Sequence, residues 1–145
     1  MKNPSILIAS SVRQKPEILN EFLSSLGELD GTGFEIRYFF IDDNIDPVSS
    51  EMLHSFAADR STVIQIKPEG EYSCTGETHH WTQQLMDRVG RQKDEILNHA
   101  QKNKYHVFLI DSDLVLHPWT LQQLWISGRE VISEIFWTQW RSREP

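Results

Sequence analysis

Two aspartates separated by one residue, Asp111 and Asp113, follow a continuous apolar run from Val107 to Ile110. Such a run is typical of a strand buried on both faces of a sheet. If the backbone stays extended beyond it, both carboxylates point to one side and Ser112 points away. Two adjacent carboxylates favour a cation between them, and their oxygens suit Mg²⁺ or Mn²⁺, which bridge to phosphate. Aspartates also open turns, so the spacing alone leaves metal binding and strand termination as alternatives.

A second strand-like run, residues 34–41, also ends in acids, at Asp42 and Asp43. An acid at the carboxyl end of a strand can bind a ribose hydroxyl or a base edge. The alternative is that both belong to the loop that caps the next helix, which is the role we expect for Asp46.

The apolar periodicity of the chain predicts strands that alternate with helices. The expected strands span residues 5–10, 34–41, 62–67, 107–110 and 130–137, and the expected helices cover about 16–27, 52–57, 81–100 and 118–128. This alternation predicts an α/β fold with a mostly parallel sheet and helices on both faces. Since parallel strands end at one edge, the acids after two of these strands are expected to meet there.

Several other polar residues are candidates for the same chemistry. Arg88 and Arg91 could reach a diphosphate, but we expect them on the solvated face of the long helix. His79 and His80 are adjacent and cannot both face one metal from a helix, so a zinc site is not expected. His117 could add a metal ligand, and an ordinary loop hydrogen bond is the simpler alternative.

The bulk properties restrict the class of protein. With 145 residues the chain forms one domain, residues 1–145. A net charge of −7 and the lack of a basic stripe argue against a nucleic-acid partner. The apolar run from Ile6 to Ala9 is too short for a membrane span or a signal segment. The single cysteine, Cys74, fits a reducing compartment, so we expect a cytoplasmic protein.

The two strand ends, FFIDD and FLIDSD, and the phrase VFLIDSDLVLHPWTL followed by EVISEIFW resemble the GT-A glycosyltransferases, in particular the nucleotide-sugar-dependent family two. The resemblance covers nearly the whole chain. It implies the GT-A form of the Rossmann-like fold. It also implies transfer of a sugar from a nucleoside-diphosphate sugar to a glycan, lipid or protein acceptor that the sequence does not identify.

The resemblance also implies roles for individual residues. Asp113 would ligate Mn²⁺ or Mg²⁺ on the donor diphosphate, and Asp111 would face the ribose or a metal-bound water. Asp42 or Asp43 would contact the nucleobase or ribose. The loop after the first strand, Ser10 to Arg13, would line the nucleotide pocket, and the metal would stabilise charge on the leaving nucleoside diphosphate.

The resemblance covers only the donor-binding half of such an enzyme. Nothing after Trp137 matches the acceptor site or its carboxylate general base, and Glu144 lies in a tail, so the catalytic base is unassigned. We therefore expect a domain truncated relative to a full glycosyltransferase, either a fragment or one completed by a partner. Its last strand and the region of Trp137 and Trp140 would be unprotected, which predicts a homodimer or larger oligomer through the C-terminal region.

Three other classes of protein share features with this sequence. A catalytically silent domain that binds a nucleotide without transferring a sugar has the same donor-site residues. A phospho-acceptor signalling domain needs an acidic pair after the first strand, where this chain has Ser10 and Ser11. Sugar-phosphate nucleotidyltransferases need a glycine-rich loop at that position, which is missing.

Overall fold

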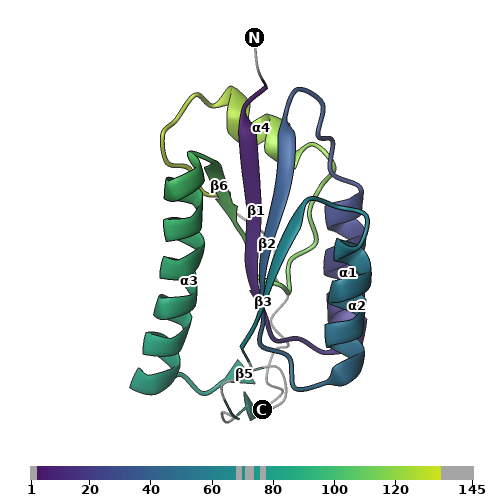
Figure 1. Ribbon diagram of the computed structural model, residues 1–145, viewed down its shortest axis with the longest axis vertical. Coiled ribbons are helices and arrows are strands. Elements are labelled where there is room, and N and C mark those ends of the chain that lie inside the picture. Colours follow the sequence, from purple (N-terminus) through teal and green to yellow (C-terminus); the bar gives the residue numbers. More distant parts are fainter. Residues whose placement is uncertain (1–2, 68–69, 71–73, 76–77, 135–145) are drawn as a thin grey trace, which may run out of the picture.

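The four main strands form one parallel sheet in the order β3-β2-β1-β6 (Figure 1). The computed structural model describes residues 3–67, 70, 74–75 and 78–134. The strands are β1 (Ser5–Val12), β2 (Glu35–Asp42), β3 (Thr62–Ile66) and β6 (His106–Leu109). The predicted α/β fold with a parallel sheet is confirmed, and its strand order is that of a Rossmann-like half.

Helices cover both faces of the sheet, as predicted. α1 (Pro16–Gly27) and α2 (Pro47–Ala57) lie on one face, and α3 (Gln83–Asn103) lies on the other. The short α4 (Thr120–Ile126) lies near the end of the sheet where β1 begins (Figure 1). Two apolar cores result, one on each face of the sheet.

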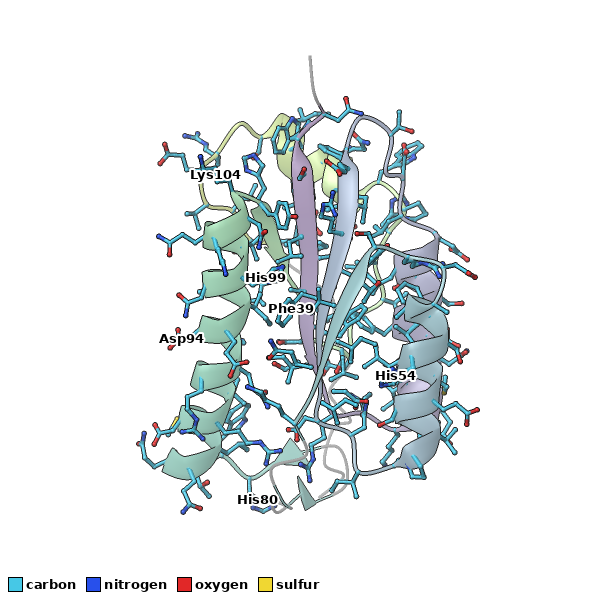
Figure 2. All side chains as sticks on the ribbon, viewed as in Figure 1. Phe39, His54, His80, Asp94, His99 and Lys104 are labelled. Atoms are coloured by element: carbon cyan, nitrogen blue, oxygen red, sulfur yellow. The ribbon has the colours of Figure 1, made fainter. Side chains whose placement is uncertain are left out.

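Side chains that alternate along the strands build these two cores. On β1, Ile6 and Ile8 pack toward α1 and α2, whereas Leu7 and Ala9 pack toward α3. β2 behaves in the same way, because Phe40 joins the first core and Phe39 the second. Figure 2 shows Phe39 pointing toward α3, where its ring centroid lies 4.8 Å from that of His99.

The helices begin at the residues that their capping preferences predict. Pro16 occupies the first turn of α1, where its missing N–H costs no hydrogen bond. Asp46 is the N-cap of α2 and accepts a hydrogen bond of 2.9 Å from the backbone N–H of Val48, which confirms its capping role. Thr82 caps α3 in the same way. All three helices therefore start at the carboxyl edge of the sheet.

Two sequence-based predictions of local structure are corrected. Residues 69–80 lie outside every strand and helix expected from the sequence, but within them Cys74–Thr75 (β4) and Thr78–His79 (β5) form a short antiparallel pair. Residues 130–134 were expected to begin a strand, yet they pair with no strand of the described chain. A strand-forming pattern needs a neighbouring strand for its backbone hydrogen bonds. The remainder of that expected strand, together with Trp137, Trp140 and Glu144, lies outside the described residues.

Within the part of the chain that the structure describes, no helix combines the length and the apolar character that crossing a membrane requires.

The buried phenol of Tyr38 predicts a loss of stability in alkali. Burial raises the pKa of Tyr38, and the nearby guanidinium of Arg60 acts in the opposite direction. The stability that depends on the protonated phenol is fully present below the pKa of an unfolded-state tyrosine, about 10, and is lost as the pH rises through the folded-state value. We expect the free energy of unfolding in urea to fall more steeply above about pH 10 for the wild type than for Tyr38→Phe. Equal pH dependence in the two proteins would contradict this assignment.

Candidate functional site

The carboxyl edge of the sheet contains a topological switch point. From β1 the chain runs outward on one side to β2 and β3, and α3 then returns it to the other side of β1, where β6 is added. Open α/β sheets bind ligands in the crevice outside the strands at such a point. The sequence-predicted site residues all follow or end strands at this edge: Ser10, Arg13, Asp42, Asp43, Asp111 and Asp113.

Asp42 is buried at the end of β2 and organises the loop that follows. Its Oδ1 accepts hydrogen bonds from the backbone N–H and Nδ2 of Asn44, at 3.1 and 2.8 Å, and from the Ser50 hydroxyl at 3.1 Å. The Nε2 of His54 lies 3.5 Å from its Oδ2. A nucleotide that bound Asp42 directly would have to replace one of these contacts.

Asp43 lies at the centre of a buried polar cluster. Arg88 forms an ion pair with its Oδ1, and Nη1 of Arg13 lies 3.7 Å from the same oxygen. Gln92 donates a 3.5 Å hydrogen bond to Oδ2. The guanidinium groups of Arg13 and Arg88 also donate to the carbonyl oxygen of Gly70, at 2.8 and 3.3 Å. The cluster thus joins the ends of β1 and β2 to the first half of α3 and to the segment after β3.

Arg88 was expected on the solvated face of α3, and that prediction is wrong. Its side chain is only 8% exposed, whereas Arg91 is exposed as expected. The buried stripe of α3 reads Leu85, Arg88, Gln92, Ile96 and Ala100. This spacing of three or four residues follows one helix face, so the sequence did contain a signal. Two polar residues on that otherwise apolar stripe indicate a buried polar partner, which is Asp43.

The Asp-Ser-Asp triplet follows β6 as a turn. Asp111 and Asp113 are exposed and Ser112 between them is buried, but the extended backbone on which the predicted alternation depended is absent. The backbone is not extended here, because the N–H of Leu114 approaches the carbonyl oxygen of Asp111 at 3.4 Å and closes a turn. Nζ of Lys93, on α3, lies 3.9 Å from Oδ1 of Asp111. Both carboxylates are therefore exposed to solvent, and that of Asp111 lies beside Lys93.

The end of β1 carries a buried hydroxyl that lacks a partner. Ser10 is fully buried, and its Oγ reaches the carbonyl oxygen of Ser11 at 3.4 Å. The Oγ of Ser11 is inaccessible to solvent and has no hydrogen-bond partner among the described residues. Strand alternation places Ser11 on the α3 side of the sheet with Ala9. An oxygen or nitrogen from a ligand or a water would satisfy this hydroxyl.

Asp111 and Asp113 are the predicted metal ligands at this edge, and both are exposed. No group of three or more histidine, cysteine or acidic side chains that could hold a metal occurs among the described residues. Asp111 and Asp113 supply two carboxylates, and Mg²⁺ commonly binds through one or two carboxylates with phosphate and water as its other ligands. His117 uses Nδ1 to accept a 3.2 Å hydrogen bond from the N–H of Trp119, the simpler of its two alternatives.

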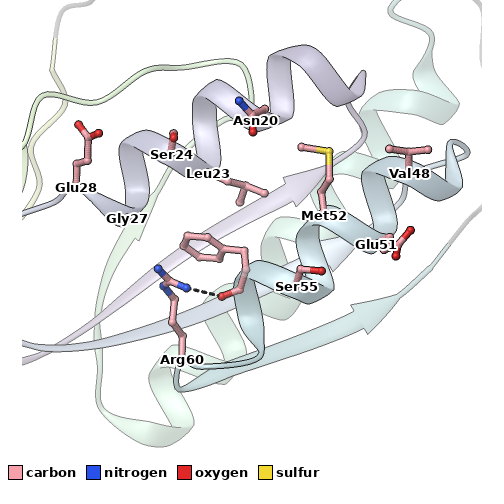
Figure 3. A pocket seen from close by; sticks show the side chains of 11 residues that line it. Asn20, Leu23, Ser24, Gly27, Glu28, Val48, Glu51, Met52, Ser55 and Arg60 are labelled. Atoms are coloured by element: carbon pink, nitrogen blue, oxygen red, sulfur yellow. Dashed lines mark hydrogen bonds between the residues drawn. The ribbon is translucent and has the colours of Figure 1, made fainter.

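A groove between α1 and α2 lies apart from this edge (Figure 3). Leu23, Met52 and Phe56 form its apolar floor, and Arg60 closes one end by donating a 2.7 Å hydrogen bond to the carbonyl oxygen of Phe56. The groove contains none of the predicted site residues, so it is not the predicted nucleotide site.

No protein-family model matches this chain, and no curated protein is significantly similar to it. The functional assignment therefore depends on the residues of the carboxyl edge.

Proposed function

We propose that this domain binds a nucleoside-diphosphate sugar and acts as the donor-binding part of a metal-dependent glycosyltransferase. One observation carries the proposal: strands on both sides of β1 deliver carboxylates to the edge where open α/β sheets bind ligands. Of these carboxylates, Asp111 and Asp113 are exposed to an incoming ligand.

Each part of the edge has a role in this proposal. Asp111 and Asp113 would hold Mn²⁺ or Mg²⁺, and such a metal would supply positive charge to stabilise a leaving nucleoside diphosphate. The segment from Ser10 to Arg13 lines the nucleotide pocket. There the buried Ser11 hydroxyl can form a hydrogen bond with an atom of the nucleotide sugar. Asp43 orients Arg13 and Arg88 toward this edge. The proposed acceptor is a glycan, lipid or protein, and the proposed location is the cytoplasm.

A second candidate function is nucleotide binding without sugar transfer. The carboxylates of Asp42 and Asp43 are engaged by neighbouring side chains, and Asp111 and Asp113 are assigned to the metal. None of these four acids is therefore placed to act as a general base toward an acceptor. Such a domain would retain the donor pocket as an interaction or regulatory module.

Calorimetric titration with UDP and with GDP, each with and without Mn²⁺, tests the donor site. We expect binding that depends on Mn²⁺ and that weakens by on the order of 100-fold or more in Asp113→Ala, because one of two protein ligands is lost. The matched control is Asp94→Ala, which removes an exposed acid from α3 and should leave affinity unchanged. Equal affinity of the wild type and Asp113→Ala would contradict the proposed metal site.

Turnover then separates the two candidate functions. The domain is incubated with a UDP-sugar that it binds, with Mn²⁺ present, and release of UDP is followed. Release that Asp113→Ala abolishes supports the glycosyltransferase. Tight donor binding without release, either alone or with acceptor mixtures, supports the silent binding domain.

A further inference from the structure

The outer edge of β6 carries apolar side chains that the described part of the chain leaves partly exposed. β6 pairs with β1, and no described strand lies on its other side. Val107 and Leu109 are 36% and 38% exposed, although Leu7 and Ala9, their register partners on β1, are buried. An open edge with apolar residues is a template for pairing with another strand.

α3 extends this apolar surface and adds positive charge to it. The contact of Lys93 with Asp111 shows that this side of α3 faces β6. Leu97 follows one turn later on the same side and is exposed. We define the β6 edge patch as Leu97, Val107 and Leu109. Lys93 lies at the Asp111 end of the patch, and Lys104, which Figure 2 labels at the C-terminal end of α3, precedes β6 at the other end.

Residues 130–134 of the same chain have features that complement the β6 edge patch. Residues 130–134 read Glu-Val-Ile-Ser-Glu, which places β-branched Val131 and Ile132 between two acids. The segment forms no strand, and Val131 is 91% exposed. A strand-forming sequence without a neighbouring strand leaves its backbone hydrogen bonds to water.

The two surfaces match in length, polarity and charge. β6 has four residues and the segment has five, both contain an apolar centre, and lysines flank one while glutamates flank the other. We propose that residues 130–134 of one copy pair with β6 of a second copy, and that the reciprocal contact closes a two-fold dimer. Each chain carries both surfaces, so in a two-fold dimer each copy's β6 edge pairs with residues 130–134 of the other copy. This dimer does not depend on the proposed sugar chemistry.

Sedimentation at micromolar concentration tests the dimer. We expect the wild type to sediment as a dimer and Val131→Lys to sediment as a monomer, because the substitution places a charge in the apolar centre of the contact. Val48→Lys is the matched control, since Val48 is an exposed valine on α2 and should leave the dimer intact. A monomeric wild type would overturn the proposal, as would a dimer that Val131→Lys does not affect.

Cysteine cross-linking tests which surfaces meet. In a Cys74→Ser background, a chain with Val107→Cys and a differently tagged chain with Val131→Cys are mixed and oxidised. We expect disulfide-linked dimers that contain one chain of each kind. Linkage of two Val107→Cys chains would indicate pairing of β6 with β6 and would overturn the proposal. A chain carrying both cysteines that bridges internally and stays monomeric would also overturn it, because the segment would then pair within its own chain.

Discussion

Arg88→Met is expected to destabilise the protein by about 3–5 kcal/mol, as measured by urea unfolding. Arg88 and Asp43 form an ion pair with side chains only 8% and 6% exposed. Removing the guanidinium leaves the carboxylate of Asp43 buried without its charged partner from α3. The penalty for a charge held in this way exceeds the modest net value of a solvent-exposed ion pair.

Two comparisons isolate this effect. Arg91→Met on the same helix removes an exposed guanidinium and should change the free energy of unfolding by no more than about 0.5 kcal/mol. Adding Asp43→Asn to Arg88→Met should recover much of the lost stability, because position 43 then carries no buried negative charge. If Arg88→Met costs no more than Arg91→Met, Arg88 does not hold Asp43 in the way described.

Phe39→Ala and Phe40→Ala are expected to destabilise the protein by similar amounts, about 3–5 kcal/mol each. These consecutive residues of β2 are both fully buried, and they point into different cores. Phe39 packs against the α3 layer, and Phe40 lies 6.1 Å from the ring of Phe56 on α2. Each truncation therefore opens a cavity on a different face of one strand.

The matched control for the phenylalanines is Val63→Ala, on the outer strand β3. Val63 is exposed, so its truncation should cost less than about 1 kcal/mol in the same urea assay. A large cost for only one of the two phenylalanines would mean that one face of the sheet lacks a packed layer.

The strands of the sheet could be predicted because each one is visible in a short, local stretch of the sequence. Buried parallel strands appear as apolar runs, and turn-forming residues separate them from helical patterns. The runs that contain Ile8, Phe40 and Phe108 became β1, β2 and β6. The boundaries of these strands moved by one or two residues, as for β1, which continues to Val12 because that residue pairs with Asp42 on β2. The second helix begins five residues earlier than its apolar pattern indicated, at Pro47. The location of the acids at one edge followed from the parallel topology.

The structural features that the sequence did not predict depend on contacts between residues that are far apart in the chain. Arg88 is buried because it forms an ion pair with Asp43, which lies 45 residues earlier in the chain. Residue type alone assigns an arginine to solvent, whereas the helical spacing from Leu85 to Ile96 places Arg88 on the buried face of α3. Residues 130–134 have high strand propensity, but they form backbone hydrogen bonds with no described strand. They are therefore not a strand in this structure. β4 and β5 have only two residues each, too few to show a period.

The pairing of β1 with β6 affects how the chain folds. Ile6 pairs with His106, so this contact closes a loop of about a hundred residues, whereas β1, β2 and β3 are joined by short crossovers. Loop closure over that length is entropically costly and slow, so the first three strands are expected to assemble before β6 docks. The Asp-Ser-Asp turn reaches the carboxyl edge only with β6. An intermediate that lacks β6 would therefore contain a packed α1–α2 layer but would lack Asp111 and Asp113 at that edge.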